Sequence, residues 1–213
     1  MIEIKNLTKK FGEQTVYQDF SLSLEENSVT AVLGASGVGK TTLLNILASL
    51  TPYEGEILGE IAPVSMVFQD DRLLPFASVQ KNLEYALGKG DYSGGLAEVG
   101  LEGCENKYPA QLSGGMARRV ALLRAFLRRG KLLLMDEPFG SLDIGVKYKL
   151  MNLFRAMWQK DKRTTVIVTH NIDEALYLGE RIIVLGEKGK ILMDEQNGDG
   201  EVLRKKIENL FNE

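Results

Sequence analysis

The fold of this chain is decided by the stretch Gly34-Ala35-Ser36-Gly37-Val38-Gly39-Lys40-Thr41-Thr42. It follows the apolar run from Ser28 to Leu33 and precedes the helix-forming segment from Leu43 to Leu47. The spacing fits the pattern G-x-x-x-x-G-K-[ST] in the strand, loop and helix context that this pattern requires. The sequence therefore predicts a loop that wraps a polyphosphate at the end of a buried strand.

Each residue type in this loop suits a phosphate ligand. Glycines adopt torsions and allow close approaches that a side chain would block. Consecutive N–H groups then point at phosphate oxygens, and the N-terminus of the following helix adds a favourable dipole. Lys40 is placed to reach the β- and γ-phosphates, and Thr41 offers a hydroxyl to Mg²⁺. A glycine-rich turn with a chance lysine would not explain why strand, spacing and helix all agree.

Composition narrows the class of protein. The 213 residues include 26 basic and 29 acidic side chains, and the formal net charge of −3 does not favour a general nucleic-acid-binding surface. The single cysteine, Cys104, cannot form an intrachain disulfide. No apolar run approaches the length of a membrane span, and the N-terminal residues lack the apolar segment of a signal peptide. We expect a cytosolic chain whose membrane association comes through a partner.

The N-terminal residues predict a small antiparallel β layer. Ile2, Ile4 and Leu7 alternate with polar residues, and a second alternating segment runs from Thr15 to Leu24. The turn expected between these strands carries Phe11, which either stacks on an adenine ring or covers the edge of the layer. Spacing alone favours neither alternative.

Three buried strands are each expected to end in polar residues, namely Gln69, Asp136 with Glu137, and His170. Ligands of doubly wound sheets bind beyond the carboxyl ends of the strands. Asp136 suits Mg²⁺, and Glu137 suits a base for an attacking water. The position of His170 favours a functional role, whereas Gln69 by itself is more typical of a surface residue.

The segment from about residue 72 to 129 predicts a helical insertion between two core strands. It ends in a helix that opens with Ser113-Gly114-Gly115, which places an N-cap hydroxyl and N–H groups at a positive dipole end. This arrangement is either a second anion-binding site or an ordinary serine N-cap. The arginines of this helix are expected to form a solvated face: Arg118, Arg119, Arg124, Arg128 and Arg129.

Together these elements predict an α/β fold over residues 1–213, organised as one domain. Its expected centre resembles a P-loop NTPase (RecA-like) core with a mostly parallel sheet, flanked by the N-terminal antiparallel β layer and the inserted α-helical subdomain. A hairpin turn at 186–190 and an amphipathic helix around Leu203 and Ile207 complete the chain.

In this order and spacing the motifs resemble those of the ATP-binding-cassette ATPases, over essentially the whole chain. Any one motif is ambiguous, but six in order are not. The family's Walker A, Q-loop, signature, Walker B, D-loop and H-loop match, respectively, 34–42, Gln69, 112–115, 134–138, 141–143 and His170.

The resemblance implies that the chain binds ATP and Mg²⁺ and closes head to tail with a second copy. Residues 34–42 would hold ATP, with Phe11 against its adenine and Thr41, Gln69 and Asp136 at the metal. Ser113, Gly114 and Gly115 would contact the γ-phosphate held by Lys40 of the other copy. Glu137 would polarise the water and His170 would support the γ-phosphate, while Gln69 and Asp143 communicate with the membrane partner and between sites.

Within the family, a stand-alone cassette is similar to a bacterial importer subunit. Residues 68–75 together with Met116 resemble the nitrate/sulfonate/taurine-type group, which includes importers of thiamine-precursor pyrimidines. Phe76 stands where that group usually has Trp, and Asn171 where it has Asp. The implied function is an ATPase at the inner face of the membrane that powers uptake through a separate permease served by a solute-binding protein.

Three alternatives compete with this interpretation. A lipoprotein-release or cell-division cassette also stands alone, and the run Asp70-Asp71-Arg72 argues against it. Soluble cassettes that act on DNA or ribosomes usually carry a coiled-coil insertion or two fused cassettes, and this sequence has neither. A P-loop kinase would lack the motif at 112–115.

Overall fold

The computed structural model describes residues 1–140 and 142–212. A three-stranded antiparallel sheet has the order β2-β1-β4. Its strands are β1 (Ile2–Phe11), β2 (Gln14–Leu24) and β4 (Glu54–Leu58). The turn expected to carry Phe11 is shorter than predicted: β1 continues through Phe11, and Gly12 and Glu13 alone reverse the chain before β2. Gly12 has φ 58°, which a glycine adopts without steric cost.

The larger sheet is parallel apart from its last strand, which pairs antiparallel with its neighbour. Its interior strands are continuous apolar runs, as expected of a sheet with both faces covered. In spatial order its strands are β5 (Val64–Val67), β6 (Leu132–Asp136), β7 (Thr164–Val168), β3 (Val29–Gly34), β8 (Arg181–Leu185) and β9 (Ile191–Gln196).

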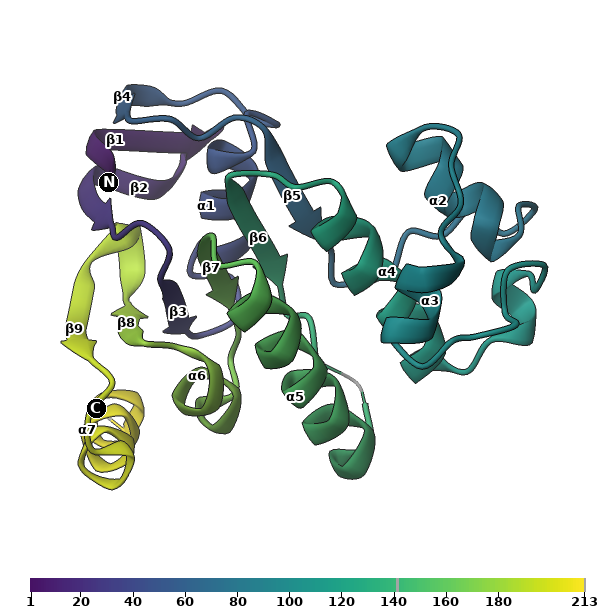
Figure 1. Cartoon of the computed structure of the whole chain (residues 1–213). Helices are drawn as coiled ribbons and strands as arrows, with labels where there is room; N and C mark the ends of the chain where they lie inside the picture. The colour runs from purple at the N-terminus through teal and green to yellow at the C-terminus, as the bar shows by residue number, and fades with distance from the viewer. Residues whose placement is uncertain (141, 213) are drawn as a thin grey trace.

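Helices cover both faces of this sheet (Figure 1). Helix α1 (Lys40–Leu47) packs between the two sheets, in one core with β1 and β2. The opposite face carries α5 (Ile144–Lys160), α6 (Ile172–Leu178) and α7 (Gly200–Asn212). Strand β6 serves both cores because side chains alternate across a strand: Leu134 faces α1, and Met135 faces α5.

The segment between β5 and β6 forms a helical lobe beside the sheet, on the right in Figure 1. It contains α2 (Val79–Leu87), α3 (Ser93–Glu98), the short 3₁₀ helix η1 (Pro109–Gln111) and α4 (Gly114–Leu127). The sequence predicted this insertion at about 72–129. None of the described helices combines the length and the apolar character that a membrane crossing requires.

Candidate functional site

The phosphate loop lies where β3 ends and α1 begins. Gly39 is the N-cap of α1 with φ 115°, and no side chain caps this end of the helix. At the other end of the loop, a Cβ on Gly34 would stand 2.8 Å from the Leu185 carbonyl oxygen. The loop therefore needs glycine at both ends, and the first N–H groups of α1 are left for a ligand.

Lys40 is buried inside this loop, with 6% of its surface exposed. Its Nζ donates to the carbonyl oxygens of Gly34 at 2.7 Å and Ala35 at 2.9 Å. Burial lowers the pKa of Lys40, and the nearby carboxylates of Glu137 and Asp136 raise it in part. A phosphate group entering the loop would favour the charged lysine further, so the loop fits an anionic ligand.

Thr41 and Asp136 place two oxygen atoms side by side from α1 and β6. The Thr41 hydroxyl donates to Asp136 Oδ1 at 3.0 Å. Burial raises the pKa of Asp136, and this hydrogen bond lowers it in part. Among the residues that the structure describes, no three His, Cys, Asp or Glu side chains gather into a metal site. Two oxygen donors beside a phosphate loop fit Mg²⁺, which binds proteins through one or two carboxylates and takes further ligands from phosphate and water.

Glu137 and His170 meet at the neighbouring strand ends. The distance from His170 Nδ1 to Glu137 Oε1 is 3.1 Å. The Glu137 amide donates to the Val168 carbonyl at 2.9 Å, so the residue is held between β6 and β7 although its φ is 41°. The structure thus brings the predicted base, the histidine and the phosphate loop to one edge of the sheet, as the carboxyl-end rule predicts.

The loop around His170 is held by a buried network that the sequence did not reveal. Glu174, 2% exposed, accepts from the Thr169 hydroxyl at 2.7 Å and pairs with Lys147 Nζ at 2.6 Å. Lys147 lies in the first turn of α5, whose N-cap is Asp143. One carboxylate therefore links the histidine loop to the segment of the expected D-loop. Ser141 of that motif lies outside the described residues.

Gln69 lies two residues beyond β5 with an exposed side chain, and its backbone is fixed by Arg118 of α4. The Arg118 guanidinium donates to the carbonyls of Phe68 and Gln69, and its Nε lies 3.1 Å from Asp71 Oδ1. The expected solvated arginine face is wrong here, since Arg118 is only 6% exposed. The planar guanidinium donates hydrogen bonds to carbonyl groups that lie beyond the end of β5 and have no partner strand. Arg124 does the same for the carbonyls of Asp71 and Arg72.

Ser113 caps α4, and its hydroxyl accepts from the Met116 amide at 3.3 Å. This confirms the predicted N-cap. Ser113 and Gly114 are exposed, and none of the hydrogen bonds or ion pairs between described residues joins them to the phosphate loop. Within one copy, the structure does not bring the second glycine motif to Lys40.

A cavity of about 340 Å³ adjoins the phosphate loop. Residues 35–38 of the loop form one wall, residues 14–16 of β2 a second, and Glu187 with Lys188 a third. The last two belong to the turn η2 (Glu187–Gly189), which the sequence showed only as a hairpin turn. Phe11 lies outside this lining, half exposed, with the Lys9 ammonium 4.4 Å from the centre of its ring.

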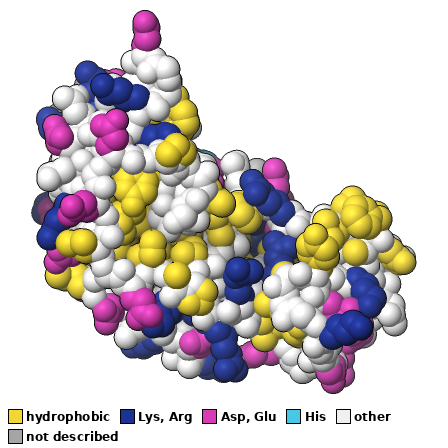
Figure 2. All heavy atoms as spheres, turned by 90° about the horizontal axis from the view of Figure 1, so that it is seen from above, with side chains coloured by type: hydrophobic (Ala, Val, Ile, Leu, Met, Phe, Trp, Pro, Cys, Tyr) yellow, Lys and Arg dark blue, Asp and Glu magenta, His cyan; other side chains and the backbone are white. Residues whose placement is uncertain are grey.

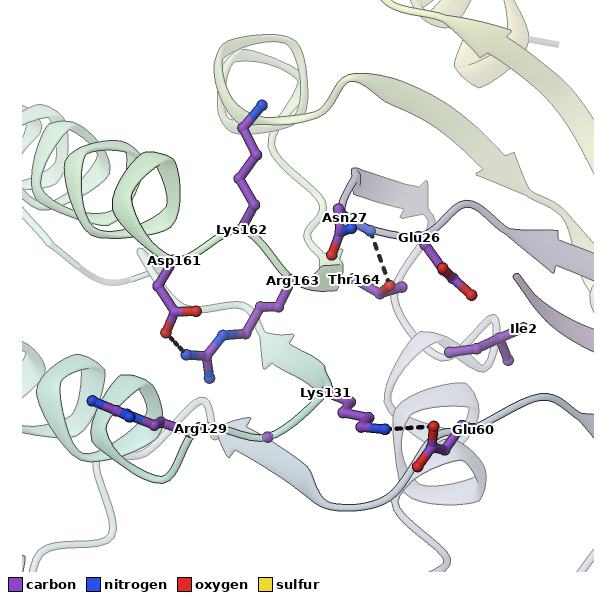
Figure 3. A pocket seen from close by; sticks show the side chains of 11 residues that line it. Ile2, Glu26, Asn27, Glu60, Arg129, Lys131, Asp161, Lys162, Arg163 and Thr164 are labelled. Carbon is purple, nitrogen blue, oxygen red and sulfur yellow. Dashed lines mark hydrogen bonds and ion pairs between the residues drawn. The ribbon is translucent and has the colours of Figure 1, made fainter.

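A cavity of similar size lies at the amino ends of the strands, the opposite ends from those that carry these motifs (Figure 3). Its charged side chains largely neutralise one another: Lys131 pairs with Glu60, and Arg163 pairs with Asp161. With three carboxylates in its lining and no part of the phosphate loop, this cavity is not the candidate nucleotide site.

Comparisons with known proteins agree with this geometry. The family model described as "ABC transporter" matches residues 17–140. The "Aliphatic sulfonates import ATP-binding protein SsuB 2" of Rhodococcus jostii (strain RHA1) is 42% identical over 200 residues, covering 91% of this chain and 82% of that protein. SsuB 1 of Paraburkholderia xenovorans (strain LB400) is 40% identical over 203 residues, but the chain spans only 59% of its length.

Solved structures give the same answer for the fold. "Dimeric Structure of MJ0796, a Bacterial ABC Transporter Cassette" superposes with a TM-score of 0.78 at 33% identity, covering 93% of this chain and 99% of that one. A structure of the same cassette, titled as a post-hydrolysis state bound to ADP and Pi, matches with the same TM-score at 32% identity. The expected fold class is confirmed, and the chain belongs to the ABC transporter family as one of its ATP-binding cassettes.

Proposed function

We propose that this chain, residues 1–213, is one ATPase domain that hydrolyses ATP to power an importer. The observation that carries the proposal is the meeting of Lys40, Thr41, Asp136, Glu137 and His170 at one edge of the sheet. The cassette that superposes on the chain has been solved with ADP and Pi, which supports nucleotide chemistry at this edge.

The residues present fit MgATP. Phosphates would lie on the N–H groups of 34–42 and on the Lys40 ammonium, with Phe11 against the adenine. Thr41, Asp136 and Gln69 would hold Mg²⁺. When bound, the metal ion neutralises charge on the β- and γ-phosphates.

Each remaining side chain has a task in hydrolysis. Glu137 would accept the proton of the attacking water while the water oxygen bonds to the γ-phosphorus and the bond from that phosphorus to ADP breaks, which requires a carboxylate at this position. The contact between His170 Nδ1 and Glu137 Oε1 orients that carboxylate. The other ring nitrogen, Nε2, would support the γ-phosphate. Lys40 stabilises negative charge on the phosphate from a fixed, buried position.

The second glycine motif completes the site from another copy of the chain. Ser113 and Gly114 are exposed at the positive end of α4, and nothing in the same copy's phosphate loop engages them. The dimeric state of the superposed cassette supports a head-to-tail homodimer. ATP binding would then close the dimer and hydrolysis would reopen it, which biases an attached permease between two states.

Mixed dimers test this composite site. With Lys40→Ala in one subunit and Ser113→Ala in its partner, both changes fall in one site and the other site stays intact, so we expect turnover to persist. With both changes in one subunit and none in the other, each site loses one residue, so turnover should fall much further. The assay is phosphate release from dimers purified through two different affinity tags. The reverse ranking would show that Ser113 serves its own chain.

A groove beside the helical lobe supports a permease as partner. Its volume is about 410 Å³. It is lined by residues of β5 and the segment after it, by residues that follow the C-terminus of α1, and by α4. Leu50, in this lining, is 62% exposed. Figure 2 shows basic side chains along the boundary between the sheet and the lobe, and hydrophobic side chains exposed on the lobe. Phe76 and Tyr85 of the lobe are 78% and 83% exposed. Exposed apolar surface of this kind marks an interaction site.

The relatives named for aliphatic sulfonate import favour uptake of a small sulfonate-like solute over lipoprotein release or cell division. The chain would then sit on the inner face of the membrane beneath its permease, and a solute-binding protein would deliver the solute. The experiment is to purify the tagged chain from membranes, identify the accompanying permease and solute-binding protein, and screen the latter against sulfonates, nitrate and pyrimidines. Recovery with a lipoprotein-release permease instead would overturn the import proposal.

A further inference from the structure

A buried tyrosine supports the phosphate loop from the N-terminal sheet. Tyr17 of β2 has no exposed surface, and its hydroxyl donates to the Gly39 carbonyl oxygen at 3.0 Å. Burial raises the pKa of Tyr17, so it remains a donor at every working pH. A phenylalanine would supply the same apolar ring, and a buried hydroxyl is costly unless it is bonded. The hydrogen bond to Gly39 is therefore what distinguishes tyrosine at this position.

The Gly39 carbonyl oxygen accepts two hydrogen bonds, one from Tyr17 and one from within α1. The latter comes from the Leu43 amide at 2.9 Å and is the first hydrogen bond of α1, so both lone pairs of the oxygen are used. The same peptide unit carries the Lys40 N–H, which a helix leaves without an internal acceptor. Hydrogen bonds to a carbonyl polarise its peptide group and strengthen the N–H as a donor. Tyr17 thus both orients and polarises the N–H that faces the phosphate site.

Tyr17 also supports the opposite wall of the cavity. Gly189 of the turn η2 packs directly on the Tyr17 ring, where a Cβ would collide. The two preceding residues of that turn, Glu187 and Lys188, line the cavity beside the loop. The Tyr17 side chain therefore contacts both the phosphate loop and the turn η2, two walls of the cavity that are far apart in the sequence.

We propose that Tyr17 is a positioning residue for the phosphate loop and that its hydroxyl sets the affinity of the loop for the phosphates of the nucleotide. The inference rests on the proposed ATPase function, because it concerns the same loop. Tyr17 touches neither nucleotide nor water in this role and acts only through Gly39 and the turn at 187–189.

The test is Tyr17→Phe, which keeps the ring and removes the hydroxyl. We expect dissociation constants for both ATP and ADP to rise about fivefold, the value of one ordinary hydrogen bond, because the loop holds phosphates common to both. The KM for ATP should rise by a similar factor while kcat changes little. Calorimetric titration with ADP and with ATP in EDTA measures binding without turnover.

Phe20→Leu is the matched control. Phe20 packs on Tyr17 with ring centres 4.9 Å apart, is 3% exposed and makes no hydrogen bond to the loop. This change should lower the melting temperature at least as much as Tyr17→Phe and leave the ADP dissociation constant within twofold of the parent. Unchanged affinity in Tyr17→Phe would overturn the inference, and so would equal weakening in both variants.

Two further measurements keep the outcomes separable. Faster hydrogen exchange of the Leu43 amide in folded Tyr17→Phe is expected, since the Gly39 peptide is no longer anchored to β2 and the first turn of α1 opens more often; unchanged exchange would count against the inference. If the parent chain itself binds neither ADP nor ATP, the proposed function fails. If the parent binds and Lys40→Ala does not, any failure of Tyr17→Phe to weaken binding concerns Tyr17 alone.

Discussion

Lys40→Ala is expected to reduce ATP hydrolysis by about a thousandfold or more, the scale of losing a buried charge that stabilises the transition state. The Lys40 ammonium is 6% exposed and is already aimed by two loop carbonyls, so no solvent rearrangement is needed when phosphate binds. Alanine removes the charge and also leaves the carbonyls of Gly34 and Ala35 without this donor. Phosphate release at saturating ATP measures the effect.

Lys205→Ala is the control for loss of a positive charge, because Lys205 is an exposed residue of α7 on the far side of the sheet from α1. It should hydrolyse ATP at the parental rate. Turnover by Lys40→Ala within tenfold of the parent would contradict the assignment of the phosphate loop as the ATP site.

Glu137→Gln is expected to lower turnover by about 10² to 10⁴, the usual contribution of general base catalysis. The amide has the shape of the carboxylate but cannot take a proton from water. Lys40, Thr41 and Asp136 are unchanged, so ATP binding and ATP-dependent dimerisation should persist. Phosphate release gives the rate, and light scattering with and without ATP gives the dimer.

Glu102→Gln, at an exposed position of the helical lobe, is the matched control and should keep both properties. Two results would contradict the role of Glu137. Hydrolysis near the parental rate would exclude it as the base. Loss of both ATP binding and turnover would show that Glu137 is needed to form the phosphate loop, not to act as the base.

Short sequence patterns predicted most of the fold because strands, helices and glycine turns depend mainly on residues that are close together in the sequence. The continuous apolar run that ends at Asp136 reads as a buried parallel strand, and the glycines of 34–39 read as a phosphate loop, since each depends on neighbouring residues alone. The carboxyl ends of parallel strands must share one edge, so Glu137 and His170 were expected to meet before any distance was known. The turn that was expected to include Phe11 proved shorter, because the length of strand pairing in a hairpin depends on its partner strand.

By itself, then, the sequence determined the fold class, the phosphate loop and the edge of the sheet where the polar residues gather. The tertiary structure decided which side chains hold that edge in place. Arg118 reads as a surface arginine, Tyr17 as a core aromatic and Glu187 as part of a turn. Tyr17 and Arg118 act through backbone groups 22 and 50 residues away, at Gly39 and Phe68, and Glu187 lines the cavity beside a loop on a different element. Such contacts depend on how whole elements pack. The hydrophobic periodicity of a segment indicates which of its side chains are buried, but not which distant group each of them contacts.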